Sequence, residues 1–213
     1  MRNATNGMSF DQLPINLFDV LLLAVLVAGI LRGRKHGMSE ELLNLLKWLT
    51  IVLLCGSFYA QGGALIGDFT SMFSKLTCYL AAYIGGVVLI LLLFIWIKRG
   101  FGGKLLGSDL FGRAEYYLGM GAGLVRFGCV LIVGLAILNA RYFSPKEVRA
   151  MEKFQDDVYG SNFFPTLYTV QSTVFDRSLT GPYIKQYLGS LLIEPTPPEK
   201  KELRQKEYTL PGA

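Results

Sequence analysis

The sequence predicts an all-α polytopic membrane protein with four transmembrane helices and a small helical extracytoplasmic C-terminal segment. Apolar residues make up 52% of the 213 residues and charged residues only 17%, a composition that a soluble domain of this size does not readily bury. Four apolar runs each approach the roughly 17–25 residues that cross about 30 Å of hydrocarbon. Basic residues gather at the ends of these runs, which is typical of membrane topology signals.

The four runs define a predicted transmembrane domain at residues 15–140. They cover residues 15–31, 42–58, 76–97 and 118–138. The first run contains Asp19, but its roughly twelve large apolar side chains favour insertion by about 4–7 kcal/mol, against about 3 kcal/mol for one central aspartate. A cleaved signal peptide is the rival interpretation, yet ILRGRKHG follows the run where an A-x-A cleavage site is expected. We therefore expect a retained helix, preceded by an extracytoplasmic segment at residues 1–14.

The densest group of charges, LRGRKHG, follows the first run. Basic residues are retained on the cytoplasmic side of a membrane, so this loop is predicted to lie inside. Its glycines would allow a tight reversal, and Ser39 with the two glutamates after it would cap the second helix. The predicted cytoplasmic hairpin comprises Arg32, Gly33, Arg34, Lys35 and Gly37.

The other two connections agree with this orientation. Residues 61–75, expected to form an outer loop, contain a single basic residue, whereas the connection from 98 to 117 is rich in lysine and arginine. Its end, SDLFGRAEYY, is expected to form a short interfacial helix with Tyr116 and Tyr117 at headgroup level. Both termini are therefore predicted to be extracytoplasmic.

Residues 141–194 have the composition of a soluble segment and predict three short helices. The first begins at SPKE, where Ser144 is the cap, Pro145 opens the helix and Glu147 completes a capping box. FFPTLYTVQSTVF and PYIKQYLGSLLI would follow as helices. Their apolar faces are too few for an independent core, so we expect docking on the membrane domain or on a partner. Residues 195–213, rich in proline and charge, are expected to form a flexible tail.

The sequence lacks motifs for catalysis, metal binding or nucleic-acid binding. His36 is the only histidine, the three cysteines lie within apolar runs without CxxC spacing, and GxSxG, HExxH and phosphate-loop motifs are missing. We expect no enzyme activity, no catalytic residue, no cofactor, no metal and no nucleic-acid partner. The expected partners are the lipid bilayer and other membrane or periplasmic proteins, or a second copy of the chain.

Ionisable side chains inside a membrane are costly, so they mark candidate functional positions. Asp19, Lys47 and Arg126 are such residues. In the fourth run Gly119, Gly123 and Arg126 recur on one helix face, where small residues permit close helix approach. The same glycines would also serve simply to pack a four-helix bundle.

Two arrangements are open for Arg126, which lies about eight residues into its helix and hence roughly 12 Å from the cytoplasmic end. It would pair with Glu41, or second-best Glu40, and lock the second and fourth helices together. Alternatively it would snorkel to the headgroups. Lys47 would contact Glu40 or lipid phosphate, and Asp19 lies too far along the membrane normal to reach Arg126.

Together these residues resemble the colicin V production protein family, small bacterial inner-membrane proteins with four predicted spanning helices. NLFD at residues 16–19 is similar to the family's Asn-Trp-x-Asp opening, and RGRKHGMSEELLNLLKW is similar to its Arg-Gly-x-x-x-Gly, Glu and Trp pattern. Glu115-Tyr116 stands where the family has an Asp-Arg pair. The resemblance singles out Asp19, Gly33, Gly37, Glu41, Trp48, Gly119, Gly123 and Arg126.

The resemblance covers about residues 15–140 and implies a location in the bacterial inner (cytoplasmic) membrane, with roles in colicin V export, a toxin-biosynthesis function, and in envelope homeostasis. A similar unit in some bacteria anchors an extracytoplasmic serine protease, for which the segment after residue 140 is too short here. We therefore expect a scaffold or assembly protein that docks an envelope or membrane complex through its C-terminal segment. The alternative is an oligomeric channel or export component whose path is lined by Asp19, Lys47 and Arg126.

Overall fold

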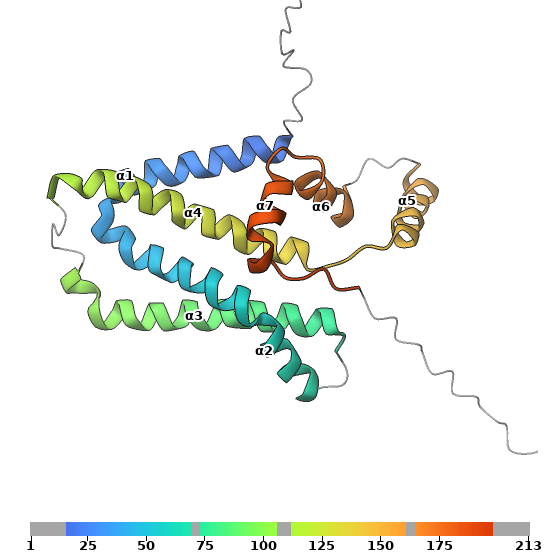
Figure 1. Ribbon diagram of the computed structural model, residues 1–213, viewed down its shortest axis with the longest axis horizontal. Coiled ribbons are helices and arrows are strands. Elements are labelled where there is room, and N and C mark those ends of the chain that lie inside the picture. Colours follow the sequence, from blue (N-terminus) through green and yellow to red (C-terminus); the bar gives the residue numbers. More distant parts are fainter. Residues whose placement is uncertain (1–15, 70–72, 106–111, 161–164, 198–213) are drawn as a thin grey trace, which may run out of the picture.

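The computed structural model describes residues 16–69, 73–105, 112–160 and 165–197, and helices account for most of them (Figure 1). Within these ranges there is no strand, and Arg141 and Thr196 form one isolated parallel bridge. The prediction of an all-α fold is confirmed. The expected segment 1–14 and most of the expected tail lie outside the described residues.

Within the described ranges, two helices are long and apolar enough to cross a membrane. They are residues Lys75–Gly100 of α3 (Lys75–Leu105) and the whole of α4 (Glu115–Asn139). The first apolar run does not reach this standard because only residues 20–31 separate Asp19 from the basic residues that follow. Among the described residues, the candidate spans by length and composition therefore lie in the second half of the predicted transmembrane domain, and the predicted four spans are met in part.

Helix α1 (Leu17–Thr50) begins with a capping box made by Asn16 and Asp19. The Asn16 backbone N–H donates to the Asp19 carboxylate at 3.0 Å, and the Asn16 side chain accepts the Leu17 N–H at 2.8 Å. These bonds satisfy amides that have no partner inside the first helical turn. The start of the helix is thus fixed by the same NLFD sequence that carries the family resemblance.

Gly37 divides α1 into a first limb, residues 17–36, and a second limb, residues 38–50, which runs back toward the start (Figure 1). Its backbone has φ 74° and ψ 173°, a conformation that favours glycine. The predicted hairpin is too long, because Arg32, Gly33, Arg34 and Lys35 are helical and only Gly37 reverses the chain. Arginine and lysine are good helix formers, so charge alone does not end a helix.

The second limb continues through a π-helical segment, Ile51–Cys55, into α2 (Gly56–Phe69). The predicted outer loop at 61–75 is therefore wrong for residues 61–69. The glycines of QGGALIG are contact points with α3 and not a turn, since a Cβ on Gly63 would overlap the Tyr79 ring and one on Gly62 would lie 3.2 Å from Ala82 Cβ. Residues 70–72 are outside the described ranges.

Helix α3 packs mainly along α2, whereas α4 contacts both limbs of α1 and lies between them (Figure 1). A single 3-10 turn, Gly112–Ala114, precedes α4. The interfacial helix predicted for 108–117 is replaced by this turn and the first turn of α4, while 108–111 fall outside the described residues. Tyr116 and Tyr117 thus belong to a long apolar helix.

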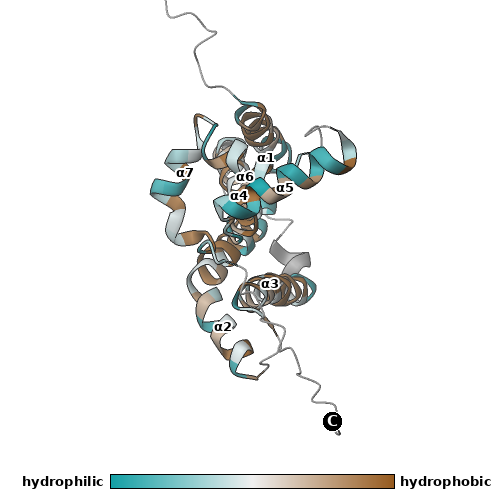
Figure 2. Ribbon diagram, turned by 90° about the vertical axis from the view of Figure 1, so that its right-hand side faces the viewer, coloured by the Kyte–Doolittle hydropathy of each residue, from teal (hydrophilic) through white to brown (hydrophobic). Residues whose placement is uncertain are grey.

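The C-terminal segment forms α5 (Pro145–Tyr159), α6 (Leu167–Phe175) and α7 (Gly181–Leu188), followed by a 3-10 turn at Gly189–Leu191. The predicted capping box is confirmed, since the Glu147 N–H donates to Ser144 Oγ and the Ser144 N–H to the Glu147 carboxylate, both at 3.3 Å. Helices α6 and α7 lie against one end of the bundle, and α5 projects beyond them (Figures 1 and 2).

One buried cluster joins the bundle to the C-terminal segment. Ile51, Tyr83 and Ala136 from the bundle are fully covered, together with Phe175 and Ile193 from the segment. Covering Phe175 and Ile193, which belong to the segment outside the predicted spans, removes roughly 2 kcal/mol of unfavourable hydration each. The segment therefore docks on the bundle, which is one of the two outcomes expected from its small apolar faces.

Candidate functional site

The first limb of α1 touches α4 through four buried glycines, Gly29, Gly33, Gly119 and Gly123. A Cβ on Gly29 would lie 2.8 Å from the Gly123 carbonyl oxygen, and one on Gly33 would overlap the Gly119 carbonyl oxygen. The backbones are therefore in direct contact, which only glycine allows. Gly119 and Gly123, which the sequence singled out in the fourth run, both contact Gly33 of the predicted hairpin.

On the same face of α4 as Gly119 and Gly123, Arg126 pairs with Glu41 of the second limb. Arg126 Nη1 lies 2.6 Å from Glu41 Oε2 and 2.8 Å from Oε1. Glu41 is only 2% exposed, so its charge has been taken almost completely out of solvent. Of the two arrangements considered for Arg126, the structure has the pair with Glu41.

The pair is matched in charge but incomplete in hydrogen bonding. Within the described part of the chain, Arg126 Nε is buried without a hydrogen-bond partner. A buried charge costs several kcal/mol unless it is paired and hydrogen-bonded. The arrangement binds the second limb to α4.

Glu115, to which the sequence analysis assigned no role, completes the chain reversal at Gly37. Its Oε1 accepts the Ser39 backbone N–H at 2.6 Å, so a side chain of α4 serves an amide at the start of the second limb. A Cβ on Gly37 would lie 2.8 Å from Glu115 Cγ and Oε1. A signal that could have indicated this role is present in the sequence, because Glu115 lies one helical turn before Gly119 and therefore on the same helix face.

Asp19 lies at the opposite end of the first limb, where it holds the loop before α7. Its carboxylate accepts the Thr180 hydroxyl at 2.6 Å and the backbone N–H groups of Leu179 and Thr180 at 3.0 and 3.2 Å. The Asn16 N–H is a further donor. A carboxylate with several donors forms strong charge-assisted bonds. We call this contact between Asp19 and residues 179–180 the outer clasp.

Further hydrogen bonds fasten the C-terminal segment to the bundle, two of them through Asn139 and Tyr59. Asn139 Nδ2 donates to the Ile193 carbonyl at 2.9 Å, and the Glu194 N–H donates to the Tyr59 hydroxyl at 3.1 Å. Sequence reasoning missed both. Asn139 and Tyr59 stand out as polar groups near the ends of apolar runs, but their partners are backbone groups, which carry no side-chain signal.

The remaining predicted site residues do not join these contacts. Lys47 Nζ lies 5.9 Å from the Trp48 ring centroid, and in the described ranges it forms no ion pair with Glu40. Arg32, Arg34 and Lys35 are exposed at the hairpin end. Asp19 is held by the loop before α7 and Arg126 by Glu41 of the second limb, so the three candidate path residues are not gathered.

The residues that the structure describes contain no group of three or more His, Cys, Asp or Glu side chains able to hold a metal ion. The three cysteines are buried and unpaired by disulfides. The buried polar contacts described above join one element to another.

A family model described as "Colicin V production protein" matches residues 18–170. The match begins one residue before Asp19 and extends through α5 into α6, so it is wider than the resemblance at residues 15–140. No curated protein and no solved structure matches the chain.

Proposed function

Because the chain belongs to the colicin V production protein family, we propose that it is an integral inner-membrane scaffold whose C-terminal segment docks an envelope or membrane complex. The proposal has four spans. The first is the first limb of α1, the second is the second limb together with α2, the third is α3 and the fourth is α4. Both termini are extracytoplasmic. The basic residues of the Gly37 end and the docked segment at the other end support this orientation.

The observation that carries the proposal is the contrast between α5 and its neighbours. Helices α6 and α7 contribute Val174, Phe175 and Gly181 to the buried interior, whereas α5 contributes no buried residue. Phe154 is 63% exposed and Val158 is 53% exposed. The bundle and the outer clasp thus hold α6 and α7 in place, and α5 projects from them.

A cleft of about 450 Å³ follows α5 and is lined by Ala150, Met151 and Phe154, among others. It is large enough to receive side chains of a partner, because ligand pockets commonly span about 300–1,000 Å³. Exposed apolar side chains at helical spacing beside such a cleft are typical of an amphipathic helix that binds a protein partner.

The charges of α5 favour a protein over a lipid surface. Helices that lie on anionic membranes carry a strongly basic polar face. Here three basic residues are outnumbered by four acidic ones, namely Lys146, Arg149 and Lys153 against Glu147, Glu152, Asp156 and Asp157. We therefore assign the partner as an extracytoplasmic protein surface with an apolar patch.

The proposal is tested by placing a photoreactive amino acid at position 154 in the full-length protein in cells, with position 153 as the matched control on the same helix. We expect one discrete protein adduct from 154, identified by mass spectrometry, and little from 153. Phe154→Asp should reduce copurification of that protein at least tenfold, whereas Lys153→Asp should not.

The thermal midpoint of each variant in mild detergent should stay near that of the wild type, because α5 buries no side chain in the bundle. Adducts from position 154 to lipid alone, or to a second copy of the chain alone, would contradict the proposal. So would unchanged copurification after Phe154→Asp.

A further inference from the structure

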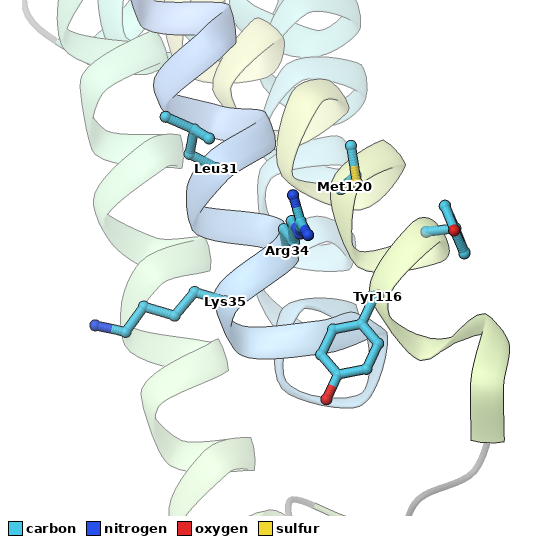
Figure 3. A pocket seen from close by; sticks show the side chains of 6 residues that line it. Leu31, Arg34, Lys35, Tyr116 and Met120 are labelled. Carbon is cyan, nitrogen blue, oxygen red and sulfur yellow. The ribbon is translucent and has the colours of Figure 1, made fainter.

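A second cleft lies at the hairpin end, between the first limb of α1 and α4. Its volume is about 640 Å³. In Figure 3, Arg34 points from α1 toward Met120 of α4, and the Tyr116 ring lies beside the hairpin. The close glycine contact places these flanking side chains opposite one another. The residues that line the cleft are Leu31, Arg34, Lys35, Tyr116, Tyr117 and Met120.

Among the described residues, the cleft is lined by two cationic side chains and by no acidic one. Arg34 and Lys35 are exposed, and within the described part of the chain neither forms an ion pair. The nearest carboxylate on α4, Glu115, is directed to the Ser39 amide through Oε1. An anion in the cleft would therefore meet two cations and two phenol groups.

An apolar stripe leads from the cleft along the first limb. Leu31, Val27 and Leu23 recur every four residues and are 62%, 44% and 63% exposed. Lys35 is the next position of this series, so one helix face presents a cation followed by three aliphatic side chains. A soluble anion would make no use of the stripe, whereas a molecule with a charged head and an alkyl chain would cover both parts.

Tyrosines at the end of an apolar helix agree with this assignment. Tyr116 and Tyr117 are 61% and 78% exposed in the first turn of α4. Tyrosine is enriched at the membrane–water interface, where its ring contacts acyl chains and its hydroxyl contacts headgroups. Basic pockets between helices on the cytoplasmic side are suited to anionic phospholipid headgroups.

We propose that this cleft binds the phosphate of an anionic phospholipid in the leaflet at the hairpin end, with an acyl chain along Leu31, Val27 and Leu23. The inference rests on the membrane orientation proposed above, but it is independent of any partner at α5. Arg34 and Lys35 attract the phosphate, and the tyrosines supply hydroxyl donors.

The test is native mass spectrometry of the delipidated full-length protein in a neutral detergent. The titrants are phosphatidylglycerol, phosphatidylcholine and inorganic phosphate. We expect saturable binding of phosphatidylglycerol, at least about tenfold weaker binding of phosphatidylcholine, and no competition from millimolar phosphate. Arg34→Gln with Lys35→Gln should weaken phosphatidylglycerol binding by about tenfold or more.

Lys98→Gln with Arg99→Gln is the matched control, because it removes the same charge from another exposed position at the end of the α3 span. It should change the affinity less than twofold. Equal loss in both double variants, equal binding of the two lipids, or displacement by phosphate would overturn the proposal. The scaffold proposal has its own test. If lipid binding fails in any of these ways but the partner adduct at position 154 is still formed, only the lipid proposal is overturned.

Discussion

At the scale of single residues, the pair between Glu41 and Arg126 is the most costly feature of the bundle to disturb. Glu41 is almost completely desolvated and Arg126 largely so, with side-chain exposures of 3% and 18%, and their mutual attraction offsets that cost only while both are present. The depth of Arg126 in its helix points to Glu41 as the preferred partner, but the sequence leaves Glu40 and the lipid headgroups open. Glu115 is different, because its function depends on an amide brought near only by the reversal at Gly37.

We predict that Glu41→Gln lowers the free energy of unfolding by about 3–5 kcal/mol, because it leaves the Arg126 guanidinium buried without a counter-charge. Arg126→Gln should have a similar effect, and the double variant should lose clearly less than the sum of the two. The measurement is unfolding of purified protein in mild detergent. Strict additivity of the single variants would mean that the pair is energetically unimportant.

Asp176→Asn is the control for this experiment. It breaks the pair of Asp176 with Lys185, whose atoms are 3.1 Å apart but whose side chains are 63% and 46% exposed. Exposed pairs contribute about 0–1 kcal/mol. The control variant should therefore unfold close to the wild type.

At the scale of elements, the contact between the first limb of α1 and α4 depends on the missing side chains of glycine. Apolar runs predict that the helices exist, but they do not tell a glycine that ends a helix from one that lets another helix approach. Gly37 ends the first limb of the helix, whereas Gly33 and Gly63 let another helix approach. For this reason the predicted hairpin and the predicted outer loop both included residues that are helical in the structure.

We predict that Gly33→Ala destabilises the protein by about 1–3 kcal/mol, since its Cβ would overlap the Gly119 carbonyl oxygen and force the two helices apart. Gly121→Ala is the matched control on α4, because its Cβ would have nothing within 4 Å. It should be neutral or stabilising by up to about 1 kcal/mol, as alanine favours the helix. Thermal unfolding in detergent measures both, and equal destabilisation would contradict a glycine-dependent contact.

At the scale of the whole molecule, the two ends of the bundle differ in chemistry. One end has the Gly37 reversal with its exposed basic residues, and the other has α5, α6 and α7 with mixed charges. The sequence predicts this polarity from loop charges alone. It does not predict how the C-terminal segment docks, because the buried cluster and the outer clasp join residues that are far apart in the chain.

We predict that a membrane-impermeant maleimide applied from the periplasm labels Lys153→Cys but not Arg34→Cys, and that both are labelled after the inner membrane is opened. The native cysteines are buried and should give a low background, which the unsubstituted protein measures. Labelling at position 34 from the periplasm would invert the proposed orientation.

The outer clasp imposes an order on biogenesis. Asp19 is translated about 160 residues before its donors at Leu179 and Thr180, which at about 5–20 residues per second is a delay of roughly 8–32 s. During that interval the Asp19 carboxylate can accept only from local donors such as the Asn16 N–H. A chain released before residue 179 never acquires the donors at Leu179 and Thr180, so its Asp19 carboxylate keeps only the Asn16 N–H among its described partners.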